Sequence, residues 1–140
     1  MTRKNPSWIL YMRAGLKIAA IIILIMIYLG HRLMMGQRYA VSKKEAVNYS
    51  GQATFDDAKA LGNELKRLRY FDGSASDVLL KKDSGLTIVS FVVNGGWNDD
   101  PTVEEYRSIG RAVAEHLLGH PLIVRMLDTH LNTHKEIKID

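Results

Sequence analysis

The sequence contains no cysteine. This absence excludes disulfide bonds, a thiolate nucleophile, and zinc or iron–sulfur centres with cysteine ligands. It leaves the compartment open, because many proteins on the oxidising side of a membrane also lack cysteine. With 140 residues, the chain has room for one domain that builds its core by packing alone.

Acidic residues are absent from the first 36 positions, which hold five of the 19 basic residues. The rest of the chain carries the other 14 basic residues and all 15 acidic ones, a net charge of −1. The overall charge of +4 therefore belongs to the N-terminal segment. A nucleic-acid-binding domain would concentrate basic residues on its own surface, so that function is not expected.

Residues 14–30 form the one long apolar run, and Lys17 is its only charged residue. At about 1.5 Å per residue, a helix of this length measures about 26 Å, close to the hydrocarbon thickness of a bilayer. Lys17 and Arg32 can extend their charged ends toward the headgroups. Trp8 and Tyr28 lie where aromatic rings favour the membrane interface.

We therefore predict a single-pass transmembrane helix over residues 14–35, a signal-anchor that follows a basic tail (1–13). A juxtamembrane linker (36–44) and a small α/β domain (45–140) come next. Two alternatives stay open: a cleaved signal peptide, although no small-x-small cleavage site follows the run, and a buried helix, although the run is apolar on all sides. Basic residues are equally numerous on both flanks, so the positive-inside rule does not choose an orientation. A short basic N-terminal tail favours a domain on the extracytoplasmic side.

Two amphipathic helices are expected in the domain. Thr54 with Asp57 three residues later forms a capping-box signal, and Asp100 followed by Pro101 forms the second helix start. Strands are predicted at residues 46–49, 77–82, 86–93, 122–127 and 131–139. This β-α-β-β-α-β-β order predicts an α+β, two-layer domain with ferredoxin-like order, both helices on one face, and an extra edge strand at the end. A different two-layer topology is the alternative.

Residues 55–93 contain a helix that runs into Tyr70 and Phe71, a Val-x-Leu strand from Val78, a turn at residues 83–85, and an apolar strand. This layout resembles a POTRA module, which implies binding of a partner polypeptide, partly by strand addition. POTRA modules end near the third strand, whereas this chain continues with a helix and two strands. As a whole, the chain resembles the small single-span membrane proteins of bacteria that have no assigned activity. No functional residue is carried over from either resemblance.

The histidines form two pairs at a spacing of four, His116 with His120 and His130 with His134. Gly119 is a helix stop that separates the first pair. On a strand, the second pair would be about 13 Å apart. We therefore expect surface histidines and no metal site.

Asp99, Asp100, Glu104 and Glu105 precede or begin the second helix, where capping and the helix dipole account for them. Calcium-loop spacing is absent. The sequence also lacks a GxSxG elbow, a Ser-x-x-Lys motif, GxGxxG and a Walker motif. We therefore expect no cofactor and have no signature of an enzyme.

A Gly-Gly pair precedes Trp97 in the loop 94–100. Trp97 either folds over the sheet edge or anchors a partner, since tryptophan is enriched at binding hot spots. Trp97, Asn98 and Asp99 are therefore the candidate partner-binding residues. The sequence favours a membrane-anchored protein-interaction or structural module whose partners are the lipid bilayer and a protein. The alternative is a small-ligand sensor or an enzyme that uses the loop 94–100 and has a concave pocket there.

Overall fold

The computed structural model describes the backbone of residues 7–34 and 36–140, and the side chains of residues 15, 17–29 and 36–140. The chain divides into two compact units, Met1–Met35 and Gly36–Asp140. Each unit is described by itself.

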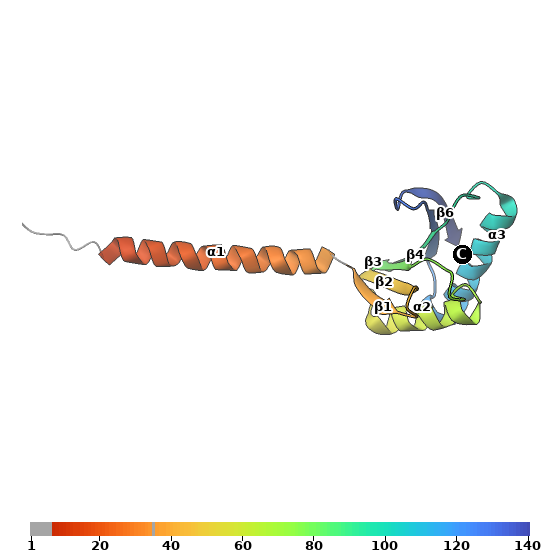
Figure 1. The fold of residues 1–140 in the computed structure, drawn as a ribbon, viewed down its shortest axis with the longest axis horizontal. Coiled ribbons are helices and arrows are strands. Elements are labelled where there is room, and N and C mark those ends of the chain that lie inside the picture. The colour runs from red at the N-terminus through yellow and green to blue at the C-terminus, as the bar shows by residue number, and fades with distance from the viewer. Residues whose placement is uncertain (1–6, 35) are drawn as a thin grey trace, which may run out of the picture. The chain divides into compact units, whose positions relative to one another are not determined.

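The regular element of the first unit is helix α1 (Ser7–Met34; Figure 1). No helix among the described residues combines the length and the apolarity needed to cross a bilayer. The transmembrane helix expected over residues 14–35 therefore stays a prediction. Residues 1–6 of the expected basic tail, and residue 35, lie outside the described residues.

The second unit contains one six-stranded sheet whose strand order follows the chain. Its strands are β1 (Gln37–Ala40), β2 (Ala46–Gly51), β3 (Val78–Asp83), β4 (Leu86–Val92), β5 (Leu122–Leu127) and β6 (Thr133–Ile139). Its helices are α2 (Phe55–Arg67) and α3 (Asp100–Val113), and α3 continues as a π-helical segment, η1 (Ala114–Leu118). The pairs β2–β3 and β4–β5 are parallel, and the other three pairs are antiparallel. The unit is thus α+β with a mixed sheet.

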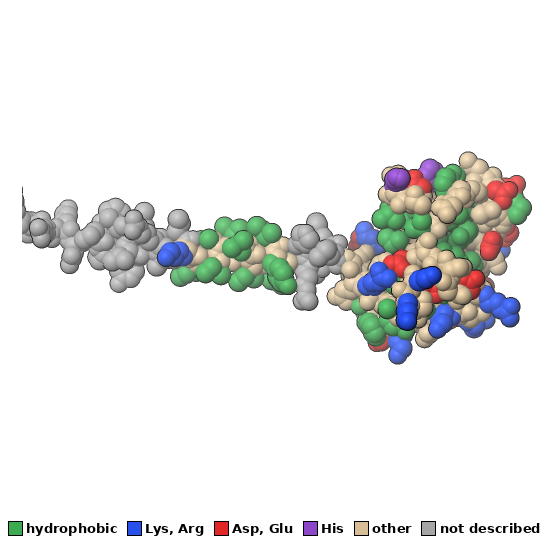
Figure 2. Space-filling model, viewed as in Figure 1, with side chains coloured by type: hydrophobic (Ala, Val, Ile, Leu, Met, Phe, Trp, Pro, Cys, Tyr) green, Lys and Arg blue, Asp and Glu red, His purple; other side chains and the backbone are tan. Residues whose placement is uncertain are grey.

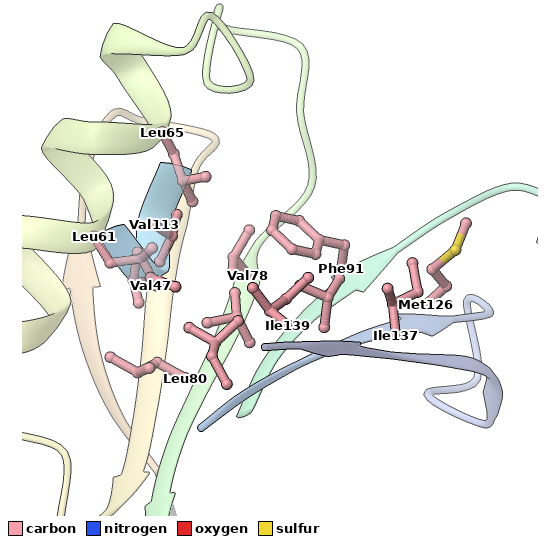
Figure 3. Packing of buried hydrophobic residues seen from close by; sticks show 14 of the residues in the cluster. Val47, Leu61, Leu65, Val78, Leu80, Phe91, Val113, Met126, Ile137 and Ile139 are labelled. Atoms are coloured by element: carbon pink, nitrogen blue, oxygen red, sulfur yellow. The ribbon is translucent and has the colours of Figure 1, made fainter. Parts of the chain in front are cut away.

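One face of this sheet makes the core. Cross-strand partners on that face are enclosed, as for Val47, Val78 and Phe91, which are at most 1 % exposed. Figure 3 shows the helices adding to the same layer, with Leu61 and Leu65 from α2 and Val113 from α3. Both helices therefore cover one face of the sheet, as the sequence predicted.

The expected ferredoxin-like strand order is wrong. In that order a third strand separates the two strands that a helix connects, whereas here those strands are direct neighbours. The cause is β1, which lies inside the expected linker (36–44). It pairs with β2 on the side where ferredoxin-like order would place β5. Tyr39 helps to fix β1, because its ring packs edge-on against Phe55 with centroids 5.4 Å apart. The last strand, β6, is the edge strand that the sequence predicted.

The two helical crossovers have opposite hands. One crossover leads from β2 to β3 and the other from β4 to β5, and both move in the same direction across the sheet. The strands β4 and β5, however, run antiparallel to β2 and β3. With both helices on one face, reversing the strand direction reverses the hand of the connection. Only about 2 % of such connections are left-handed, so one crossover of this domain belongs to the rare class.

Gly110 of α3 marks a close approach between helix and sheet. A Cβ atom there would lie 2.6 Å from Cγ2 of Val124 and 3.0 Å from Cδ1 of Ile139. Alanine gains about 1 kcal/mol in helix propensity, but overpacking a stiff neighbour costs about 1–3 kcal/mol. We predict that Gly110→Ala lowers the free energy of unfolding by about 1 kcal/mol, measured by chemical denaturation. Ser108→Ala, on the exposed side of α3, should be neutral or slightly stabilising. A Gly110→Ala protein more stable than wild type would contradict this packing.

Candidate functional site

The loop between β4 and α3 holds the three candidate partner-binding residues. Gly95 and Gly96 have φ values of +99° and +77°, which glycine adopts without steric cost, so the chain turns sharply after β4. Trp97 is half-buried behind this turn, and Asn98 is exposed.

Asp99 caps helix α3. The cap expected from the sequence, Asp100, is wrong by one position. The Asp99 carboxylate accepts hydrogen bonds from the backbone amide of Thr102 at 3.2 Å and from its hydroxyl at 2.6 Å. Asp100 becomes the first helical residue and Pro101 the second, a position where the missing amide still costs no helical hydrogen bond. The Asp99 carboxylate is thus engaged by the helix. By contrast, Thr54 and Asp57 form the capping box of α2 that the sequence predicted.

Trp97 stacks on His134, which lies in β6. The ring centroids are 4.0 Å apart and the ring planes are 19° from parallel. Nε2 of His134 lies 2.9 Å from Oδ2 of Asp128. A carboxylate only accepts hydrogen bonds, so Nε2 carries the proton that makes this bond. Trp97 thus folds over the edge strand, the first of the two alternatives that the sequence left open, and joins two segments 37 positions apart.

Asp128 organises the loop between β5 and β6. Its carboxylate accepts hydrogen bonds from the backbone amides of His130 at 2.8 Å and Asn132 at 2.9 Å, and from the Asn132 side chain at 3.1 Å. The hydrogen bond from His134, followed by that from the Asn132 amide, holds the pKa of Asp128 well below its usual range. Leu131 projects from this loop, 55 % exposed and with φ of +65°.

These two loops follow the parallel neighbours β4 and β5, so they meet at one end of the sheet. We call the exposed or half-buried side chains of Trp97, Asn98, Leu131 and His134 the Trp97 surface. Figure 2 shows histidine side chains at the surface of the second unit, close to hydrophobic ones. The enzyme or sensor alternative required a hollow at the loop 94–100. A hollow that the structure does describe lies elsewhere, between the end of α2 and the middle of α3.

A second polar cluster joins α2 to η1. Glu64 is 8 % exposed. Its carboxylate accepts hydrogen bonds from Nε of Arg67, at 2.9 Å, and from Nη2 of the same side chain. Nδ1 of His116 lies 3.0 Å from Glu64 Oε1. The hydrogen bonds from Arg67 and then His116 lower the pKa of Glu64 to about 2, against the opposing effect of burial. His116 and His120 are separated as expected, since His120 Nδ1 instead lies 3.2 Å from the Ile139 carbonyl oxygen.

Glu45 is a buried carboxylate that the sequence analysis did not single out. It is 2 % exposed and accepts hydrogen bonds from the Ser42 hydroxyl at 3.0 Å and from the amides of Gly73 at 2.8 Å and Ala75 at 3.2 Å. It therefore holds the segment before β3 against the β1–β2 turn. No local pattern predicts the contacts with Gly73 and Ala75, because these residues lie 28 and 30 positions from Glu45.

Within the described ranges, no three side chains of the metal-binding types come together as ligands. In the pairs His134–Asp128 and His116–Glu64, further hydrogen bonds hold each carboxylate, which is typical of structural ties between segments. No family model matches the sequence, and neither the curated proteins nor the solved structures contain a match. Function must therefore be inferred from the surfaces themselves.

The low pKa of Glu64 has a consequence for stability. The folded-state pKa of about 2 lies below the usual value of 4.5, so the ionised carboxylate stabilises the fold above about pH 4.5 and this contribution is lost as the pH falls toward 2. We predict that Glu64→Gln lowers Tm at pH 7 and flattens the fall of Tm between about pH 5 and pH 2.5. Glu115→Gln, at an exposed position nearby, should keep the wild-type slope. Identical slopes in wild type and Glu64→Gln would refute the role of this cluster.

Proposed function

We propose that this protein is a single-pass membrane-anchored interaction module that binds an extended segment of a partner polypeptide along the outer edge of β6. The observation that carries the proposal is the continuity of that edge with the Trp97 surface. The stack of Trp97 on His134 attaches the loop 94–100 directly to the edge strand.

Strand β6 pairs with β5 on one side only, and among the described residues no strand covers its other side. An edge of this kind offers a row of backbone donors and acceptors to an incoming strand. Lys135, Glu136 and Lys138 line β6, and charged residues on an edge discourage indiscriminate pairing. The edge is therefore suited to a specific partner and not to aggregation.

The Trp97 surface supplies side-chain contacts next to that edge. A half-buried tryptophan that is fixed by stacking loses little conformational entropy when it binds. Leu131 is an exposed apolar side chain in a left-handed backbone conformation that costs stability, which favours a role in contact with a partner. The resemblance of residues 55–93 to a POTRA module implies the same mode of binding.

Anchoring to a membrane is the second part of the proposal. Supporting it, the apolar run 14–30 contains one charge, and the described large side chains from Ile18 to Leu29 are 51–68 % exposed. Figure 2 shows hydrophobic side chains around this part of α1. Such a surface is more favourable in lipid than in water. The short basic tail favours placing the domain on the extracytoplasmic side.

The partner site can be mapped by site-specific photo-crosslinking in cells. We predict that a photoreactive amino acid at Asn98 or at Lys138 forms adducts with one partner polypeptide, because both positions are exposed and lie on the Trp97 surface or on β6. The same amino acid at Lys59, on the exposed side of α2, is the matched control and should form none. Mass spectrometry of the adducts identifies the partner, a second copy of the chain included.

The variant Trp97→Ala tests whether the Trp97 surface and the edge of β6 bind the same partner. We expect this substitution to reduce the adduct from Lys138 several-fold, since each contact with a buried aromatic anchor is worth about 2 kcal/mol or more. Equal labelling from Lys59 and Lys138, or no adduct from either Asn98 or Lys138, would reject the binding edge.

Anchoring and orientation are measured with one introduced thiol. Because the sequence has no cysteine, Lys59→Cys provides the only reactive position. We predict that this variant stays in the membrane fraction after alkaline extraction and that a membrane-impermeant maleimide labels it in intact cells.

Replacing Ile22 and Ile25 with glutamate should release the protein from the membrane fraction, because a charge in mid-bilayer costs about 3 kcal/mol. Glutamates at two positions outside the run, Lys43 and Lys44, serve as control. Release of the unaltered chain by alkali would reject the anchor, and labelling only after lysis would reverse the orientation.

A further inference from the structure

A hollow of about 310 Å³ lies between the end of α2 and the middle of α3. This is the size of a small-ligand site, at the lower end of the range of about 300–1,000 Å³. Its apolar lining comes from Leu68, Ile109 and Ala112, and Arg69 and Glu105 bring opposite charges to the same lining. It shares no residue with the Trp97 surface and plays no part in the function proposed above.

Arg69 has a backbone conformation that favours glycine. After α2 ends, the Tyr70 amide donates to the Leu65 carbonyl at 2.9 Å and the Arg69 amide to the Lys66 carbonyl at 3.0 Å. This is the Schellman arrangement, in which the residue at the Arg69 position is left-handed and usually glycine. Arg69 has φ of +60°, and a side chain there costs stability. An arginine at this position is therefore expected to serve a purpose other than folding.

The two charged residues of the lining, Arg69 and Glu105, are exposed, and the charged residues near them form ion pairs. Arg67 binds Glu64, and Glu104 binds both Arg107 and Arg111. Arg69 and Glu105 form no ion pair with any residue of the described unit 36–140. Their charges are therefore available to a ligand.

Tyr70 places a neutral phenol in the same lining. Burial raises its pKa well above the usual range, and the neighbouring Tyr106 and then Glu105 act in the same direction. A phosphate or a dicarboxylate would be repelled by Glu105, and a purely apolar ligand would desolvate both charges without compensation.

We propose that this hollow binds a small zwitterion of the amino-acid type. Its carboxylate faces Arg69, its ammonium group faces Glu105, and its aliphatic side chain packs on Leu68 and Ile109. A free amino acid and the end of a short peptide share this chemistry.

Isothermal titration of the full-length chain in detergent with L-leucine tests the proposal. We expect a dissociation constant of about 1 mM or lower for a ligand of this size. Leucinamide lacks the carboxylate and N-acetylleucine lacks the ammonium group, so each should bind at least tenfold more weakly. Inorganic phosphate should not bind. Tighter binding of the dipeptide Leu-Gly than of leucine would assign the site to a peptide end, and the reverse to a free amino acid.

Arg69→Gly separates ligand binding from folding. It relieves the left-handed strain, so Tm should rise by about 4 °C, while leucine affinity falls at least tenfold. Ser84→Gly is the matched control, because Ser84 has φ of +47° in the distant β3–β4 turn. It should raise Tm and leave the affinity unchanged. Glu105→Gln should weaken binding several-fold at constant Tm. Wild-type affinity in Arg69→Gly, or no leucine binding by wild type at tens of millimolar, overturns the proposal.

Discussion

Burial of a single face of the sheet is the constraint on which the rest of the domain depends. From β2 to β6, alternate residues place apolar side chains on that face, whereas the opposite face mixes apolar residues such as Ile88 and Ile123 with polar ones such as Asn48, Arg125 and Lys138. Both helices must therefore pack on the same side. Since β3 and β4 form a hairpin between two adjacent parallel pairs, this one-sided burial forces the crossovers to have opposite hands. The free energy of apolar burial thus outweighs the usual preference for a right-handed connection.

Local signals were sufficient to predict the elements of the domain but not their neighbours. The capping box at Thr54 and the apolar periods specify both helices and five strands, because each is decided within a few residues. Strand β1 was not predicted, because it has four residues and its apolar side chains, Tyr39 and Ala40, are adjacent and give no period-two pattern. Its pairing with β2 then excluded ferredoxin-like order. Asp99 and Asp100 are both competent caps, and only the three-dimensional path of the loop selects the first.

For the candidate site too, local features could be predicted from the sequence and contacts between distant segments could not. The loop 94–100 and Trp97 stood out from composition alone, and the edge strand from its place at the end of the order. The contact between the loop 94–100 and the edge strand could not be predicted, because the stacking of Trp97 on His134 depends on β4 and β5 being parallel neighbours. The same holds for Glu64 with His116, which are 52 positions apart. The periodic pattern of apolar residues in a helix or strand predicts which side of that element is buried. It does not predict which distant segment packs against that side.

Residues whose type does not suit their backbone conformation also indicate where this chain could bind other molecules. In the part of the chain that the structure describes, three non-glycine residues have positive φ, namely Arg69, Ser84 and Leu131. Ser84 lies in a tight hairpin turn, where the strand register explains its conformation. Arg69 ends α2 in a Schellman arrangement, and Leu131 lies in the β5–β6 loop, where its amide donates to the Asp128 carbonyl at 3.0 Å. Both conformations favour glycine, and neither residue is glycine. A sequence selected for stability alone would replace both with glycine. This conflict between residue type and backbone conformation is what favours Arg69 and Leu131 as the groups through which the two proposed ligands bind.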